Sequence, residues 1–448
     1  AQRPLAPREA AGRDYAELRF EAPEAERHTL SGGITVFFIE EHTLPLVNLF
    51  ARFRGGPSNL GRSRLGAATA VSSLLRAGGT RSLPPDSLEA RLDHYAIQTA
   101  IGGGGRSAFQ NVNALSKHLE PALELWAEMV RYPRFDSTAV EVWRRRELED
   151  ARRRPDDPGR LAISTFNHLL YGDHPVGWVL SPDDLEPTDV TPAALREVHA
   201  RIFCPDNLVL GVVGDVTWAE LEPLLERVTD GWPACTEPLP APPAPRFDVR
   251  PGVYLVPRPI PQSTVIVGHT SPVRLADEPA YFASRIANQL LGSSGFSSRL
   301  MRRVRTQAGL AYSVASVWTT PRDTDGVVAA VTQTRADRTV AATRLILDVL
   351  REARSEPPAA SEVEHLVQRT ANSFVFNFQD PAQIVSRQMF YLAQGLPADW
   401  LDIYLSGIEA VTADQVLEAF RRTLRPDEAV ILIVGDPEHF DEPPSALG

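Results

Sequence analysis

The alternation of apolar and polar residues along this chain predicts a protein of mixed strands and helices. Apolar runs, some of them alternating with polar residues, indicate strands at 34–39, 46–53 and 207–213. Apolar residues that recur every three to four positions predict helices instead. The expected helices cover 65–76, 85–94, 117–132, 137–153, 160–170 and 192–202. This mixture indicates an α/β or α+β fold.

One local pattern joins a charged residue to an aromatic one. Residues 297–307 are expected to form a short helix, Gly309 to end it in the left-handed conformation, and residues 310–318 to form a strand. Arg305 then lies in the last helical turn and Tyr312 at the start of the strand. Placed this way, a guanidinium and a phenol converge on one extended peptide, where they can hold a carbonyl group and stabilise an oxyanion. The alternative is structural: an arginine that complements the helix dipole and an ordinary strand aromatic.

The chain also contains an internal repeat. Residues 190–215 align with residues 411–436 at a constant offset of 221, and ten of the 26 aligned positions are identical. Two homologous domains follow from this repeat. The proline-rich segment between them is expected to be a semi-extended linker. The predicted organisation is a polar leader at 1–28, a first domain at 29–236, the linker at 237–250 and a second domain at 251–448.

Composition and charge narrow the classes of function. The 448 residues are 43% hydrophobic and carry a net charge of -11. That balance suits a globular protein and disfavours a nucleic-acid partner, because nucleic-acid binding relies on clustered Lys and Arg. No apolar run approaches the roughly 20 residues that span a bilayer. Cys204 and Cys235 are the only cysteines, and they either pair with each other or remain free thiols.

The start of the chain bears on location. It opens with Ala-Gln, followed by a leader rich in Pro, Arg and Glu. This resembles a mature terminus left by a signal peptidase. A periplasmic or secreted location is therefore expected, with the cytoplasm as the alternative.

The motif Arg-x-x-x-Gly-Leu-Ala-Tyr-Ser-Val at 305–314 follows a Gly/Ser loop and Ser-Ser-Arg-Leu, and it resembles the C-terminal-domain signature of the pitrilysin/insulinase family of zinc metallopeptidases. In that family an Arg and a Tyr with the spacing of Arg305 and Tyr312 bind substrate opposite a zinc site on another domain. The resemblance implies two α/β (α+β) domains, each a mostly antiparallel sheet packed with helices. The preceding loop resembles, in shortened form, the substrate-contacting Gly-rich loop of the non-catalytic subunit of mitochondrial processing peptidase. The substrate-binding residues that it implies are Gly292, Ser293, Ser294, Gly295 and Phe296.

The zinc-binding half of the family's site is missing from this sequence. Active members carry His-x-x-Glu-His on an early helix, where two imidazoles bind zinc from one helical face and the Glu acts as general base. The resemblance places Thr69, Ser72 and Ser73 at these positions, and residues 43–93 contain no His. The downstream acidic ligand falls near Asp150, and a carboxylate without two imidazoles is not a zinc site.

Two other candidate chemistries have weaker support. Glu41 and His42 resemble the end of the zinc motif, but Phe38 occupies the first ligand position, so a surface pair is expected. A hydrolase that uses Ser72 or Ser73 as nucleophile lacks a general base nearby in the sequence.

The retained Arg/Tyr pair and the missing zinc ligands together predict a division of labour between two chains. The expected function is that of the non-catalytic, substrate-binding subunit of a heterodimeric zinc metalloendopeptidase, with Arg305 and Tyr312 contacting extended or unfolded peptides. A homologous partner with His-x-x-Glu-His is expected to supply the zinc, and this chain is expected to bind no cofactor itself. The alternative is a proteolytically inactive scaffold or binding protein of the same fold, which has no need of the Arg/Tyr pair.

Overall fold

The structure, a computed structural model, describes residues 24–448. Residues 1–23 of the predicted polar leader lie outside the described residues. Residues 26–28, also predicted as leader, belong to strand β1 (Glu26–Thr29), which pairs with β2 (Thr35–Glu40). Within the described part of the chain, every helix is too short or too polar to span a bilayer.

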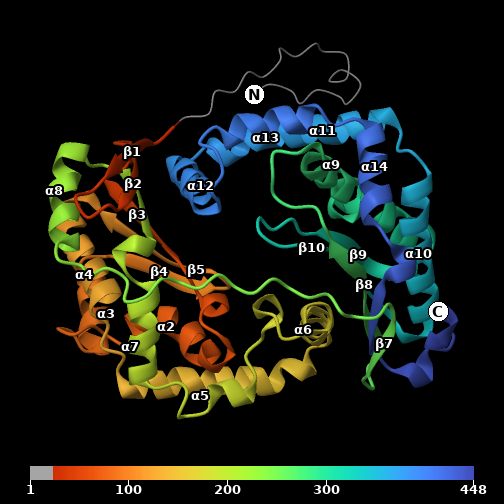
Figure 1. The fold of residues 1–448 in the computed structure, drawn as a ribbon, viewed down its shortest axis with the longest axis horizontal. Helices are drawn as coiled ribbons and strands as arrows, with labels where there is room; N and C mark the ends of the chain where they lie inside the picture. Colours follow the sequence, from red (N-terminus) through yellow and green to blue (C-terminus); the bar gives the residue numbers. More distant parts are fainter. Residues whose placement is uncertain (1–23) are drawn as a thin grey trace, which may run out of the picture.

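The first half of the chain folds around a six-stranded sheet (Figure 1). β2 and β6 run parallel and the other neighbouring strands antiparallel. In β3 every second residue is buried, because apolar residues alternate with polar ones as the sequence predicts. In spatial order the strands are β1, β2, β6 (Leu208–Gly214), β3 (Leu46–Arg54), β5 (Ser107–Leu115) and β4 (Gln98–Gly104). The helices that share its hydrophobic core are α2 (Leu65–Ala77), α3 (Pro85–His94), α4 (Leu119–Arg131), α5 (Ser137–Arg153), α7 (Pro192–Ile202) and α8 (Trp218–Thr229).

The second half repeats this plan around a five-stranded sheet. In spatial order its strands are β7 (Gly252–Pro257), β11 (Val430–Gly435), β8 (Gln262–Ser271), β10 (Gly326–Arg335) and β9 (Ala311–Trp318). β7 and β11 are parallel and the other neighbours antiparallel, as in the first sheet from β2 to β4. The helices of its core are α9 (Pro279–Asn288), α10 (Thr339–Ser355), α11 (Ala360–Phe374), α12 (Pro381–Gln394), α13 (Trp400–Glu409) and α14 (Ala413–Thr423). The predicted fold class is confirmed: two similar halves, each a mostly antiparallel sheet packed with helices.

One helix of each half packs against the sheet of the other half. α6 (Pro158–Tyr171) belongs to the first half, yet its Phe166 shares a buried cluster with Leu432 of β11. α12 (Pro381–Gln394) belongs to the second half, yet it covers β6: a Cβ at Gly211 would lie 2.5 Å from Met389 Sδ. Figure 1 shows α6 and α12 between the two sheets. The halves are therefore joined by packing as well as by the chain, and the exact domain bounds stay a prediction.

The proline-rich segment crosses from the first half to β7 (Figure 1) and forms no helix or strand between residues 231 and 251. Asn59 Nδ2 donates a hydrogen bond to Pro240 O at 2.9 Å. Cys204 and Cys235 form a disulfide at the start of the segment, so the two cysteines are paired and not free. The extended segment is thereby held against the first half.

Candidate functional site

Arg305 lies on η10 (Met301–Gln307), a π-helical segment in place of the α-helix predicted over residues 297–307. The Ala308 N–H donates to Arg303 O, five residues back, whereas apolar spacing in a sequence predicts only the four-residue bonds of an α-helix. Such wide turns recur at functional sites. Gly309 ends the segment with a φ of 64°, the left-handed conformation that the sequence predicts. β9 then begins at Ala311.

A β-bulge turns Tyr312 away from the buried face of the second sheet. Gln333 of β10 pairs with Ser313, and the next residue, Thr334, pairs with Ala311. Tyr312 is therefore left without a residue opposite it. Bulges recur beside active sites because they redirect a side chain. Tyr312 is 81% exposed as a result, which is unusual for a strand aromatic.

The Arg305 guanidinium lies over two exposed aromatic rings. Its Cζ is 4.7 Å from the centroid of the Phe296 ring and 4.8 Å from the centroid of the Tyr312 ring. Both distances are within the range of cation–π attraction. Phe296 is 69% exposed, so the group remains open to solvent. The structure thus brings together three of the residues predicted for the site.

The neighbours of Arg305 on the same segment are paired, and Arg305 is not. Arg303 forms an ion pair with Glu352 at 2.6 Å, and Arg302 a longer one with Glu362 at 3.9 Å. Among residues 24–448, the Arg305 guanidinium makes no hydrogen bond or ion pair, and its polar contacts are limited to the two rings. Its N–H groups are therefore available to a ligand.

The segment predicted to be a substrate-contacting loop lies against β9, and its first residues belong to the π-helical segment η8 (Gln289–Ser293) instead of a loop. Gly292 is buried, and a Cβ at this position would lie 2.4 Å from the backbone nitrogen of Ser316 on β9. Only glycine allows this close approach of loop and strand. The exposed or half-buried residues that follow are Ser293, Ser294, Gly295 and Phe296. Phe296 contacts Arg305, whereas substrate binding by the whole loop stays a prediction.

The three positions predicted to replace the zinc motif lie on α2 and do not fit a metal ion. Thr69 donates its hydroxyl to Leu65 O of its own helix at 2.8 Å. Ser72 is 4% exposed, and its Oγ lies 2.6 Å from where a Cβ on Gly103 of β4 would be. Ser73 points to solvent. The residues that the structure describes offer Ser72 no hydrogen-bonded base, so the serine hydrolase alternative gains no support.

Asp150, near the predicted downstream ligand position, is engaged by arginines. Arg160 of α6 donates to both carboxylate oxygens, at 2.9 and 2.7 Å, and Arg154 adds a contact of 3.4 Å. Hydrogen bonds from Arg160, and then the arginine charges, hold the pKa of Asp150 below its ordinary value. The carboxylate therefore links α5 to α6, and it has no imidazole with which to form a zinc site.

A second possible ligand group lies by the proline-rich segment. In the described part of the chain, Cys204, Asp206 and Cys235 form the one cluster of three or more side chains spaced for a metal ion. The disulfide between the two cysteines removes both thiolates, which are the forms that bind metal. The cluster does not fit a metal site.

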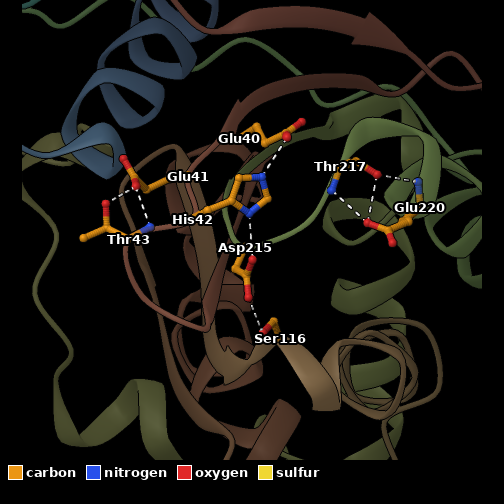
Figure 2. Close-up of polar contacts among 8 residues, drawn as sticks. All are labelled: Glu40, Glu41, His42, Thr43, Ser116, Asp215, Thr217 and Glu220. Atoms are coloured by element: carbon orange, nitrogen blue, oxygen red, sulfur yellow. Dashed lines mark hydrogen bonds and ion pairs between the residues drawn. The ribbon is translucent and has the colours of Figure 1, made fainter.

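A polar cluster that the sequence does not predict gathers at one end of the first sheet (Figure 2). His42 donates from Nδ1 to Asp215 and from Nε2 to Glu40, each at 2.7 Å. The hydrogen bond to Asp215, and then that to Glu40, raise the pKa of His42. Ser116 donates to the other oxygen of Asp215 at 2.7 Å. Because Ser116 bonds to the carboxylate and not to the imidazole, the cluster is not a Ser-His-Asp catalytic arrangement.

The remaining side chains in Figure 2 have local roles. Glu41, expected to pair with His42, instead accepts a hydrogen bond from the Thr43 backbone at 2.8 Å. Glu220 and Thr217 form a capping box at the start of α8. His42 and Asp215 are 173 residues apart, and no local sequence signal predicts that they meet.

Comparisons with known proteins add the following similarities. Residues 189–370 match the family described as "Peptidase M16 inactive domain". The chain is 30% identical over 302 residues to an uncharacterised zinc protease of Mycobacterium leprae and 23% identical over 283 residues to a non-peptidase homologue of Helicobacter pylori. The matched regions span 65% and 64% of those relatives, somewhat less than two thirds, and 65% and 63% of this chain. A crystal structure of a peptidase M16 inactive domain from Pseudomonas fluorescens superposes with a TM-score of 0.83 and 26% identity, over 92% of this chain and 98% of the other.

Proposed function

Because this chain belongs to the peptidase M16, or pitrilysin, family as one of its inactive members, we propose that it is the substrate-binding subunit of a heterodimeric zinc metalloendopeptidase. One observation carries the proposal. The Arg305 guanidinium lies over two exposed rings and is unpaired among the described residues, while its neighbours on the same segment form ion pairs. A half-buried arginine with free donors, beside exposed aromatic rings, suits a ligand that comes from outside the chain.

In this proposal, Arg305 and Tyr312 donate hydrogen bonds to an extended or unfolded peptide. Zinc and the general base would come from a homologous chain with His-x-x-Glu-His, since the residues on α2 and Asp150 do not fit a zinc ion. Neither chain alone would then hold a complete site. Loss of one donor to a reacting oxygen typically lowers turnover by about 100–1000-fold.

The disulfide between Cys204 and Cys235 supports a periplasmic or secreted location, because such bonds persist in oxidising compartments. Alkylation of free thiols in intact host cells, before lysis, tests this. Unmodified, non-reduced cysteines in the periplasmic or secreted fraction are expected, and a reduced protein in the cytoplasm would contradict the location.

The test of the function is purification of the protein from its host, followed by native mass spectrometry and metal analysis. A 1:1 complex with a chain that carries His-x-x-Glu-His and one zinc is expected. Tyr312→Phe, which removes only a hydroxyl, should lower peptide turnover by that complex without dissociating it. A metal-free assembly, or the same turnover with and without the Tyr312→Phe substitution, would favour the scaffold alternative.

A further inference from the structure

The chemistry of Arg305 also indicates which part of a peptide it holds. Resting on the function proposed above, we propose that the Arg305 guanidinium binds a carboxylate of the peptide, either the terminal α-carboxylate or an Asp or Glu side chain. A second arginine of this chain, Arg131, serves as an internal reference.

Arg131, like Arg305, lies over two aromatic rings, but its terminal donors are occupied. Its Cζ lies over Tyr132 at 5.1 Å and over Trp232 at 5.5 Å from the ring centroids. Its Nη1 donates to Val228 O at 2.5 Å and its Nη2 donates to Asp230 O at 2.8 Å. A guanidinium held by two rings in this protein therefore takes two oxygen atoms, one on each terminal nitrogen. Arg305 presents the same two donors with no acceptor among residues 24–448.

The geometry of the acceptors at Arg131 is not available in an extended peptide. Val228 O and Asp230 O converge because the chain turns at the end of α8. In an extended chain, carbonyls on the same side recur every two residues, about 6.6 Å apart, which is too far for the two parallel N–H groups at the end of a guanidinium to reach both. A carboxylate offers two oxygens in one plane, and this matches the paired N–H groups. For an extended peptide, the two-oxygen acceptor is therefore a carboxylate.

The acidic side chains among the described residues form no ion pair with Arg305, so a carboxylate of the ligand can pair with it. The chain has 57 acidic and 46 basic residues, so acidic partners are plentiful, and Arg302 and Arg303 use two of them. Arg305 forms no ion pair with a carboxylate of the described residues, and its guanidinium lies over Phe296 and Tyr312 instead. An acidic group supplied by the ligand would meet no competing internal carboxylate.

The experiment measures binding of four fluorescein-labelled hexapeptides to the full chain by fluorescence anisotropy. The first two share a neutral sequence and end in a carboxylate or an amide. The other two are amidated and differ by one internal Glu or Gln. If the α-carboxylate is bound, the acid form should bind at least about tenfold tighter than the amide. If a side chain is bound, the Glu peptide should bind at least about tenfold tighter than the Gln peptide.

Variants identify the residue responsible. Arg305→Lys keeps the charge but loses the planar pair of donors. It should therefore abolish most of the preference for the carboxylate-bearing peptide, while the affinity for the matching neutral amide stays unchanged. Arg302→Gln, on the same segment, is the matched control and should change neither. Circular dichroism confirms that both variants are folded.

Two results would overturn the inference in distinguishable ways. Equal affinity for all four peptides, weakened equally by Arg305→Gln, would exclude carboxylate binding by Arg305 but would still support peptide binding there. If no peptide binds at millimolar concentration, carboxylate binding by Arg305 is excluded, and the proposed peptide-binding function is contradicted as well.

Discussion

Two regions of this molecule are those that the sequence predicts to match the two parts of a pitrilysin-type site, and they differ in how their side chains are used. On α2, Ser72 is packed against β4, and the nearby acidic position, Asp150, is neutralised by Arg160. On β9, Tyr312 is exposed, and on η10 the half-buried Arg305 has no ion pair among the described residues. The side chains at the positions predicted to replace the zinc ligands take part in packing and ion pairs, whereas those of the Arg/Tyr region do not pair in this way.

The difference shows which residues the fold itself requires. A buried serine and a paired aspartate contribute to stability, so their presence says little about chemistry. An exposed tyrosine redirected by a bulge, and an arginine kept from pairing, contribute little to stability. Their arrangement is therefore what the proposed binding of a peptide would require.

The largest effect on the free energy of unfolding is expected from a substitution on α2, the packed region. Ser72→Glu would place a carboxylate against Gly103, where there is no room and no hydrogen-bond partner for it, and should lower the free energy of unfolding by at least about 3 kcal/mol. Ser73→Glu, at the adjacent exposed position, should change it by less than about 0.5 kcal/mol. Urea denaturation of both variants measures this. Equal stabilities would mean that α2 is not packed as described.

The next effect tests the exposed side. Arg305→Gln should lower kcat/KM of the reconstituted complex by about 100-fold, because a donor to the substrate is lost. The same change should alter the free energy of unfolding by no more than about 1 kcal/mol, since only the cation–π contacts with two exposed rings are lost. Peptide hydrolysis assays and urea denaturation of one preparation separate the two quantities. A large loss of stability would assign Arg305 a structural role and break the contrast with α2.

A third test compares the interiors of the two halves. Burial lowers the pKa of His199 in the first half and of His269 in the second to about 4, against 6.5 for an unperturbed imidazole. The unfolded chain then binds more protons between pH 4 and 6.5. Stability should be complete above pH 6.5 and fall below it, by up to about 1.4 kcal/mol per pH unit for each imidazole. Urea denaturation at pH 7 and pH 5 checks this.

A variant assigns part of that pH dependence. His269 Nε2 accepts a hydrogen bond from the Arg425 N–H at 2.8 Å, so the ring is held neutral. His269→Gln keeps an acceptor but cannot titrate, and it should make the pH dependence shallower. An unchanged slope would show that His269 is not the group that responds to acid.

The smallest effect concerns the exposed cluster of Figure 2. Because Asp215 and Glu40 raise the pKa of His42, the stabilisation by this cluster is present below pH 6.5 and is lost as pH rises through the folded-state pKa. Asp215→Asn should move that pKa down toward 6.5 in an NMR titration. Ser116→Ala, which removes a bond to Asp215 only, should move it less. A pKa that is insensitive to Asp215 would contradict the hydrogen-bond arrangement.

Local sequence patterns were sufficient for most of the first half and for part of the site. The strand predicted at 46–53 is β3 (Leu46–Arg54), and the helix predicted at 65–76 is α2 (Leu65–Ala77), because alternation and helical spacing act over a few residues. The left-handed Gly309 and the strand after it also follow from local preference. The approach of Arg305 to Tyr312 was predicted from these elements, while their role with substrate stays a prediction.

Features that depend on distant contacts could not be predicted from those patterns. The π-helical turn at η10 and the bulge at Tyr312 depend on how loop and strand pack together, as the contact of Gly292 with Ser316 shows. Helical spacing predicts that α6 has an apolar face but does not say which sheet it covers. The His42 cluster needs residues 173 positions apart.

The exchange of α6 and α12 between the halves has a mechanical consequence. A rotation of one sheet relative to the other would separate α6 from β8 and β11, or α12 from β2 and β6, and expose their apolar faces to water. The proline-rich segment therefore does not act as a hinge, and the distance between α2 and β9 is set by helix packing. In a two-chain peptidase this subunit would be one rigid wall of the chamber, and the entry of a peptide would depend on movement of the partner.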